Sequence, residues 1–474
     1  MPTKKASKTG NTKAKASAAK KVTSTAAKRV TKAAGNNAGL SKAEEAKPTS
    51  RTAAAQTPVA RETAEKRAAA KKVAPEPKAS TGARSYALAA GGTNAMPVVL
   101  LFEDDPTIVA EFRRLCEPKL GTTCRLEVFP LDKPPSNSDK PYDDRVEEWI
   151  RGCAFYERIV LIVTDRDLST NSLHWKGLSQ TAVSAAAKVL GLPVAGYRRV
   201  RPNIIDEFKR IPGDGLIDLS PEVNLRSSQV ASLSKGFIDL RQRLENWHEN
   251  GDGVQEGATS KKRRGAQATA ASPGALLAGV LKQPTAAGHF DTFACGDQVA
   301  INEILRFSRS DTNVRMSVQV HRRLVAALGV WLTDLVMKYP GVLVNTIAAA
   351  SYLDIHPDDF VRPQVQELFK SARYTQLPFE DEDAPLWWRH LLDEMLSEAG
   401  CSNGRELCGK RMIKNVRFCP CDADNTLHAG YYCMATGKPI SAEKSSGRVR
   451  WFPPGADLAR LQAKTYRKLA PWIG

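Results

Sequence analysis

Two groups of acidic residues follow apolar segments of the chain and have side chains suited to metal chemistry. Glu103, Asp104 and Asp105 come directly after the run "VVLLF", and Asp165 and Asp167 follow the run "RIVLIVT". Crowded carboxylates repel one another unless a cation or a proton neutralises them. Mg²⁺ prefers carboxylate and water oxygens as ligands. The two groups therefore predict a magnesium site, provided that the fold brings them together. The alternative is that these side chains cap helices and turns at strand ends.

The elements that must position these groups alternate between apolar strands and helical patterns. The predicted strands are "PVVLLF" (97–102), "CRLEVF" (124–129), "RIVLIVT" (158–164), "LPVAGY" (192–197) and "GLIDLS" (215–220). Such alternation predicts an α/β fold, a doubly wound five-stranded parallel sheet of the receiver or flavodoxin type. Ligands of these sheets bind at the carboxyl ends of the strands, so the two acidic groups should converge there.

The stretch "VVLLFEDDPTIVAEFRRLC" resembles the opening of a response-regulator receiver domain. The resemblance covers about residues 97–249, a third of the chain. It implies that Asp104 and Asp105 bind Mg²⁺ together with Asp165, and that Asp165 accepts a phosphoryl group from a histidine kinase or another signalling protein. Glu103 and Asp167 would line the same pocket.

The chain departs from the receiver pattern at two positions. Receivers carry Ser or Thr at the end of the fourth strand and Lys at the end of the fifth. Here the fourth strand offers only the hydroxyl of Tyr197, and Ser220 stands where the Lys would be. Arg198 and Arg199 are cations that could replace this Lys. The departures favour a degenerate receiver that no longer switches by phosphorylation.

Two other functions remain open from the sequence. Glu103 with the pair Asp165 and Asp167 is also similar to a Toprim domain, which implies a Mg²⁺-dependent nuclease or other nucleic-acid enzyme. The Gly that commonly follows the Toprim Glu is missing. The third possibility is a non-catalytic scaffold protein with a vestigial pocket. The receiver reading implies a regulatory protein rather than an enzyme.

Residues 1–95 carry most of the net positive charge of the chain. They contain 20 Lys/Arg against 5 Asp/Glu, whereas the whole chain has a net charge of +18. With so few apolar side chains the segment is predicted to be a disordered tail. Its Lys/Ala-rich texture resembles the tails of linker histones and bacterial nucleoid proteins. It predicts nonspecific affinity for DNA or RNA through phosphate contacts; a solubilising spacer is the alternative.

The remainder of the chain divides into a predicted linker, residues 250–288, and a mainly helical effector or interaction domain, residues 289–474, after the α/β domain of residues 96–249. In this C-terminal domain, Trp387 and Trp388 are adjacent within a predicted helix. Either both are buried structural side chains, or one of them faces a partner, because neighbouring positions of a helix do not share one face.

A Cys-rich segment, residues 401–433, contains residue types that bind zinc. Four of its cysteines are predicted as a zinc set: Cys408, Cys419, Cys421 and Cys433. Structural zinc needs four S or N ligands, but the C-x-C spacing of "FCPC" differs from the usual C-x₂-C pairs. Buried structural thiols are the alternative.

No apolar run approaches the roughly 20 residues of a membrane span, and no membrane association is predicted. The N-terminus lacks the apolar core of a signal peptide. We therefore expect reduced thiols and a cytoplasmic protein of a bacterial cell, with nucleoid association through the basic tail.

Overall fold

The computed structural model describes residues 96–133, 139–166, 168, 174–200, 215–250, 272–294, 318–420 and 428–473. The predicted tail, residues 1–95, lies outside these ranges. So do Asp167 and Cys421. Among the described helices, none combines the length and the apolar composition that crossing a bilayer requires.

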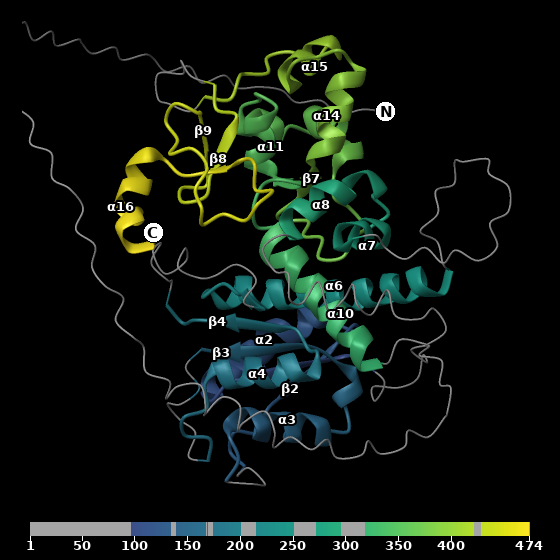
Figure 1. The fold of residues 1–474 in the computed structure, drawn as a ribbon, viewed down its shortest axis with the longest axis vertical. Coiled ribbons are helices and arrows are strands. Elements are labelled where there is room, and N and C mark those ends of the chain that lie inside the picture. Colours follow the sequence, from purple (N-terminus) through teal and green to yellow (C-terminus); the bar gives the residue numbers. More distant parts are fainter. Residues whose placement is uncertain are drawn as a thin grey trace, which may run out of the picture. The chain divides into compact units, whose positions relative to one another are not determined.

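A five-stranded parallel sheet forms the first part of the described chain (Figure 1). Its strands are β1 (Val98–Phe102), β2 (Arg125–Val128), β3 (Ile159–Asp165), β4 (Val194–Tyr197) and β5 (Leu216–Asp218), arranged in the order β2-β1-β3-β4-β5. All four neighbouring pairs are parallel. The α/β sheet predicted from the sequence is confirmed, and this strand order is compatible with a flavodoxin-like or receiver-like fold.

Helices cover both faces of this sheet (Figure 1). They are α2 (Pro106–Leu120) and α6 (Val223–Asn250) on one face, and α3 (Tyr142–Gly152) and α4 (Gln180–Leu190) on the other. Alternating β1 side chains enter two separate cores, with Val99 and Leu101 beside α2 and α6, and Leu100 and Phe102 beside α3 and α4. This double burial is why the strand is apolar throughout.

The C-terminal part consists of helices with short strands between them. Its main helices are α7 (Pro273–Val280), α8 (Ala287–Ala294), α10 (Val318–Trp331), α11 (Thr346–Tyr352), α12 (Pro357–Phe360), α13 (Pro363–Leu368), α14 (Arg389–Glu398), α15 (Gly404–Lys410) and α16 (Ala463–Ile473). Its strands are β6 (Leu343–Asn345), β7 (Leu386–Trp388), β8 (Tyr431–Cys433), β9 (Lys438–Ile440) and β10 (Ala459–Arg460).

One hydrophobic core is shared between the sheet and the C-terminal part. Phe237 of α6 and Leu328 of α10 belong to the same cluster as Val99 of β1. The phenyl rings of Phe237 and Phe379 meet edge to face, with centroids 4.9 Å apart. Helix α6 is therefore packed on both sides, against the sheet and against the C-terminal part.

Helix α7 corrects the predicted linker at its C-terminal end. It lies inside the range 250–288, and its Leu276 and Leu277 are buried. Ser272 caps the helix by accepting a hydrogen bond from the Ala275 N–H. The leucines of this segment supply enough apolar surface to order the helix against the core.

The two adjacent tryptophans lie in a strand, not in the predicted helix. Both are buried, each with 1% of its surface exposed, because successive strand side chains point to opposite faces. Trp387 packs against Phe360, and Trp388 packs against Phe290. The alternative in which both are structural core residues is confirmed.

Candidate functional site

The two acidic groups meet at the carboxyl edge of the sheet. Strands β1 and β3 are paired neighbours, and Phe102 lies opposite Thr164 in their register. Glu103 and Asp165, the next residues, are therefore side by side. The sequence-based expectation that the acidic groups converge is met for these two residues.

Three carboxylates form a group of the kind that holds a metal. One oxygen each of Glu103, Asp104 and Asp165 lies within 4.8 Å of the others, and within the described ranges this is the one such group of His, Cys, Asp or Glu. The group therefore contains Glu103 in place of Asp105, which the sequence predicts as a ligand. Asp105 Oδ1 instead accepts a hydrogen bond from the Thr107 N–H at 2.9 Å and caps helix α2. Asp167 lies outside the described residues.

Arg199 places its guanidinium among these carboxylates. Its Nη2 donates to Glu103 Oε1 at 3.0 Å, and its Nε donates to Asp165 Oδ2 at 3.1 Å. The same group lies 3.8 Å from Asp104 Oδ1 and 3.5 Å from Asp105 Oδ2. The side chain of Arg199 is 42% exposed, whereas that of Glu103 is fully buried. Arg199 therefore neutralises the pocket from its solvent side.

Burial controls the ionisation of Glu103. Desolvation raises the pKa of Glu103, and the negative charge of Asp165 raises it further. Hydrogen bonds from the Tyr197 hydroxyl and the Asp105 N–H, together with Arg199, oppose this shift without cancelling it. Asp105 differs, because the hydrogen bond from the Thr107 N–H lowers its pKa. The pKa of Glu103 is therefore raised, whereas the pKa of the neighbouring Asp105 is lowered.

A second layer of residues lies behind Glu103. The Tyr197 hydroxyl donates a hydrogen bond to Glu103 Oε2. The guanidinium of Arg226, from α6, lies 3.9 Å from the centroid of the Tyr197 ring. Arg226 is buried, with 2% of its surface exposed. Burial lowers its pKa, while the charges of Tyr197, Glu103 and Asp165 oppose that shift. A buried cation thus stabilises the acidic pocket through an aromatic ring.

The fifth strand supplies no cation to the pocket. Ser220 Oγ accepts a hydrogen bond from the Glu222 N–H at 3.2 Å, at the start of α6. Asp218 of β5 pairs instead with Arg166, at 2.6 Å. Among the described residues, the cation in direct contact with the pocket carboxylates, Arg199, comes from the segment after β4. The sequence offers Arg199 as one of two replacements for the Lys, whereas no sequence pattern indicates Arg226, which lies on a distant helix.

The predicted zinc ligands give no metal group among the described residues. Cys408, Cys419 and Cys433 are buried, and none belongs to the group of ligand atoms described above. Burial raises the pKa of the Cys408 thiol to about 11, which favours the protonated form. Because Cys421 lies outside the described residues, the zinc set stays a prediction.

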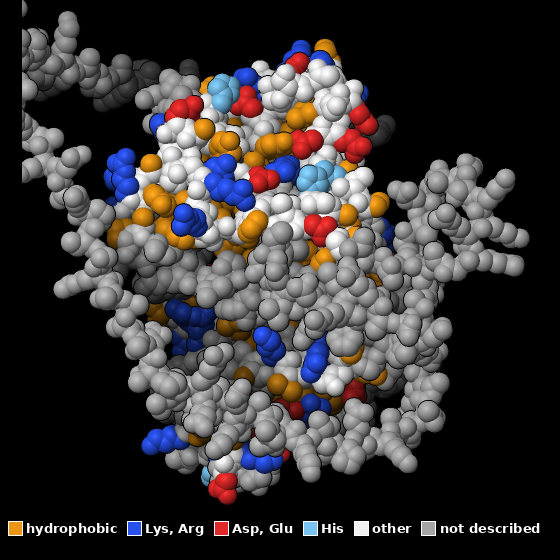
Figure 2. Space-filling model, in the orientation of Figure 1, with side chains coloured by type: hydrophobic (Ala, Val, Ile, Leu, Met, Phe, Trp, Pro, Cys, Tyr) orange, Lys and Arg blue, Asp and Glu red, His pale blue; other side chains and the backbone are white. Residues whose placement is uncertain are grey.

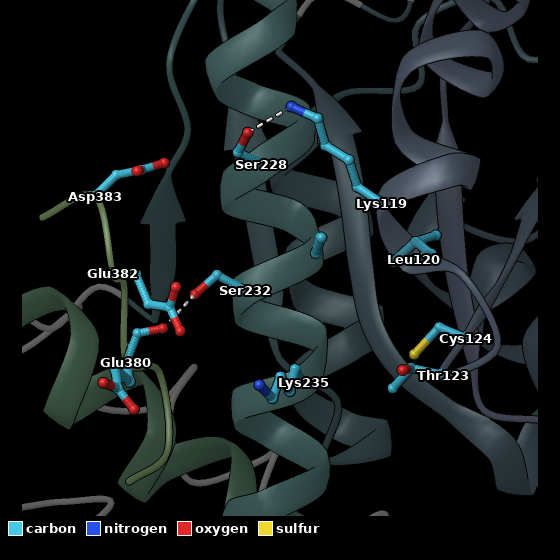
Figure 3. A pocket seen from close by; sticks show the side chains of 11 residues that line it. Lys119, Leu120, Thr123, Cys124, Ser228, Ser232, Lys235, Glu380, Glu382 and Asp383 are labelled. Carbon is cyan, nitrogen blue, oxygen red and sulfur yellow. Dashed lines mark hydrogen bonds between the residues drawn. The ribbon is translucent and has the colours of Figure 1, made fainter. Parts of the chain in front are cut away.

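A separate pocket of about 480 Å³ lies between α6, the end of α2 and residues 380–383 (Figure 3). Lys119 Nζ donates to Ser228 Oγ at 2.5 Å across its wall, and Ser232 Oγ donates to the Glu380 carbonyl at 3.3 Å. Lys235 also lines this pocket. The Ser232–Glu380 hydrogen bond links the α/β part to the C-terminal part at this pocket.

Comparison with protein-family models, with curated proteins and with solved structures found no match for this chain.

Proposed function

We propose that this chain is a regulatory protein whose receiver-like α/β part senses a cation or a phosphoryl group at Glu103, Asp104 and Asp165 and controls the C-terminal part. The observation that carries the proposal is the convergence of these carboxylates at the carboxyl ends of β1 and β3, in a five-stranded parallel sheet. A phosphoryl group on Asp165 would need a cation opposite its charge. Histidine kinases are the class of partner that this reading implies.

The donor set suits Mg²⁺, which binds carboxylate oxygens together with water. Glu103, Asp104 and Asp165 would hold the ion, and the ion when bound would neutralise negative charge in the pocket. Arg199 supplies this neutralisation from within the chain, since its guanidinium contacts the same carboxylates. Arg199 and a divalent cation therefore compete, and the charge of the pocket depends on which of them is present.

Helix α6 supplies a route from the pocket to the C-terminal part. Arg226, near its start, contacts the ring of Tyr197, whose hydroxyl reaches Glu103. Further along α6, Phe237 packs against Phe379. A change of charge at the pocket alters the balance of forces on Arg226 and hence the position of α6 against its C-terminal neighbours.

The proposal is tested on the full chain with Mg²⁺ and the phosphoryl analogue beryllofluoride. A ligand that binds only the folded state raises its melting temperature. We expect the two reagents together to raise the melting temperature of the wild type, and D165N to abolish the rise. D218N is the matched control. Asp218 ends β5 at the same edge of the sheet, but its carboxylate pairs with Arg166. No rise in the wild type contradicts phosphoryl sensing at Asp165.

The closeness of the Glu103 and Asp165 carboxylates, whose oxygens lie within 4.8 Å of each other, supports a nucleic-acid enzyme as a second candidate function. Glu103, with its raised pKa, has the character of a general acid. Plasmid nicking in Mg²⁺ or Mn²⁺ that is lost in both E103Q and D165N would establish this candidate. Intact plasmid at all protein concentrations would eliminate it.

A further inference from the structure

The net positive charge of the described C-terminal part is concentrated in its last segment. Residues 428–473 contain eight Lys/Arg and two Asp/Glu, whereas residues 318–420 contain twelve Lys/Arg and thirteen Asp/Glu. Seven of the eight cations are exposed: Lys438, Lys444, Arg448, Arg450, Lys464, Arg467 and Lys468. Figure 2 shows Lys and Arg side chains on the side of the molecule where Figure 1 draws α16. We call these seven residues the basic surface.

Backbone and ring contacts hold the parts of the basic surface together. The Ala463 N–H donates to the Lys444 carbonyl at 3.0 Å, which fixes the loop before β10 against the start of α16. The indole of Trp451 stacks on the ring of Tyr466, with centroids 5.3 Å apart. On α16 itself, Lys464, Arg467 and Lys468 have the i, i+3, i+4 spacing of one helical face.

Within the described residues, six of the seven cations of the basic surface are not neutralised by neighbouring carboxylates. In the described part of the chain, Lys438, Arg448, Arg450, Lys464, Arg467 and Lys468 form no ion pair. Of the two acidic residues in the segment, Asp457 pairs with Arg389, at 3.3 Å. Unpaired like charges repel one another, so their concentration on one surface costs stability unless a polyanion binds there.

The chemistry of the basic surface favours nucleic acid as the polyanion. An amphipathic segment that inserts into a lipid surface presents large apolar side chains beside its cations. The exposed large apolar side chains of the described residues are Val189, Val200, Leu225, Val361 and Met412, and none lies in residues 428–471, where the burial of the side chains is described. Aromatic rings are present instead: Trp451 and Tyr466 are half-buried, and the Arg460 guanidinium lies 4.3 Å from the centroid of the Tyr431 ring. Cations beside aromatic rings are typical of surfaces that bind the backbone and bases of nucleic acids.

We propose that the basic surface is a folded, sequence-independent nucleic-acid-binding surface, separate from the tail of residues 1–95. It rests on the described C-terminal residues alone and does not depend on the function proposed for the acidic pocket. Its cations contact phosphates, and each contact releases counterions, so binding weakens as salt rises.

The test uses the full chain, single-stranded and double-stranded oligonucleotides, and a series of salt concentrations. We expect K464Q/R467Q/K468Q to weaken binding and to reduce the slope of log affinity against log salt by about two to three, at roughly 0.7–0.9 per lost phosphate contact. The control is K188Q/R411Q/K414Q, which removes three exposed cations from other elements and should leave the slope within about one of the wild type. Equal slopes for the two triple variants would overturn the proposal.

Lysine footprinting of the wild type separates the basic surface from the tail. Acylation of lysines is followed by mass spectrometry with and without oligonucleotide, so no variant has to fold. We expect Lys438, Lys464 and Lys468 to become protected while Lys188 stays reactive. Reactivity of all four that is unchanged by oligonucleotide would overturn the proposal. So would protection of the three by phosphatidylserine vesicles but not by oligonucleotide, since the ligand would then be a lipid surface.

Discussion

Arg199 donates a hydrogen bond to Asp165 over 3.1 Å, across the carboxyl edge of the sheet. The same guanidinium reaches Glu103, so one cation of the chain joins carboxylates that follow two different strands. Such buried carboxylates need a positive charge close by, and the chain supplies it itself. The behaviour of the pocket should therefore depend first on Arg199.

Replacing Arg199 with Gln should destabilise the protein when no divalent cation is present. The buried carboxylates then lose their counter-charge, while the partial exposure of Arg199 limits the cost to about 1–3 kcal/mol. Chemical unfolding in the presence of a chelator measures this loss. Adding Mg²⁺ should restore part of the stability of R199Q, and R198Q is the neighbouring control. An R199Q protein as stable as the wild type in chelator would contradict this role of Arg199.

Removing the hydroxyl of Tyr197 should also cost stability. Y197F leaves Glu103 Oε2 without the hydrogen bond from Tyr197 in a buried site, at a cost of about 1–3 kcal/mol. Because that hydrogen bond lowers the pKa of Glu103, its loss should raise this pKa further. Y142F is the control, since the Tyr142 hydroxyl makes an exposed hydrogen bond. Equal unfolding free energies for the two variants would argue against a buried Tyr197–Glu103 contact.

Glu103 should make the stability of the protein depend on pH in a defined direction. Its pKa in the folded state is raised above the ordinary value of 4.5, so the folded state binds more protons than the unfolded state. The contribution of Glu103 to the stability of the folded state is fully present below pH 4.5 and is lost as pH rises through the folded-state pKa of Glu103. The unfolding free energy of E103Q should therefore increase relative to the wild type over this interval.

The matched control for this pH dependence is D105N. The pKa of Asp105 is lowered, so its contribution is lost only as pH falls below the ordinary value of 3.8. The difference in unfolding free energy between D105N and the wild type should thus stay constant above pH 4.5. The difference between E103Q and the wild type should change in the same range. Parallel curves for E103Q and the wild type above that pH would rule out a raised pKa for Glu103.

The packing of α6 against the C-terminal part should be sensitive to one added methyl group. A Cβ on Gly236 would lie 2.1 Å from Phe379 Cδ1 and 2.6 Å from its Cε1, and the ring has to move. We expect G236A to cost about 1–3 kcal/mol and to increase amide hydrogen exchange in residues 374–380. G288A, at a helical glycine with open space around it, should be neutral or stabilising by up to about 1 kcal/mol. Equal effects of the two substitutions would contradict the close approach of α6 to Phe379.

The parallel sheet was predictable because strands that are buried on both faces consist almost entirely of apolar residues. Val98 to Phe102 are all buried, and an apolar run of this length between turn residues has few other structures open to it. Because the carboxyl ends of parallel strands lie at one edge of the sheet, Glu103 and Asp165 could be expected to lie close together. The local pattern was less informative at Trp387 and Trp388, where a three-residue strand is followed at once by helix α14 and the periodicity of the helix dominates the sequence.

Contacts between distant segments were beyond the reach of the sequence. Arg226 lies on the polar-looking start of α6, and nothing in its neighbourhood distinguishes it from an exposed Arg; its burial follows from the packing of α6 against Tyr197. The role of Asp105 was equally hidden, because an Asp before Pro106 is both a good helix cap and a plausible metal ligand. Only the geometry at the end of β1 shows that Asp105 caps helix α2, whereas Glu103 and Asp104 lie with Asp165.

The most direct test of the account is calorimetric titration of Mg²⁺ into the full-length wild type, R199Q, and R199Q combined with D165N. If Arg199 is the resident cation of the pocket, R199Q should bind Mg²⁺ at least about tenfold more tightly than the wild type, equivalent to roughly 1.4 kcal/mol, and D165N should remove the gain. Equal affinities of R199Q and the wild type for Mg²⁺, or a gain that persists without Asp165, would contradict it.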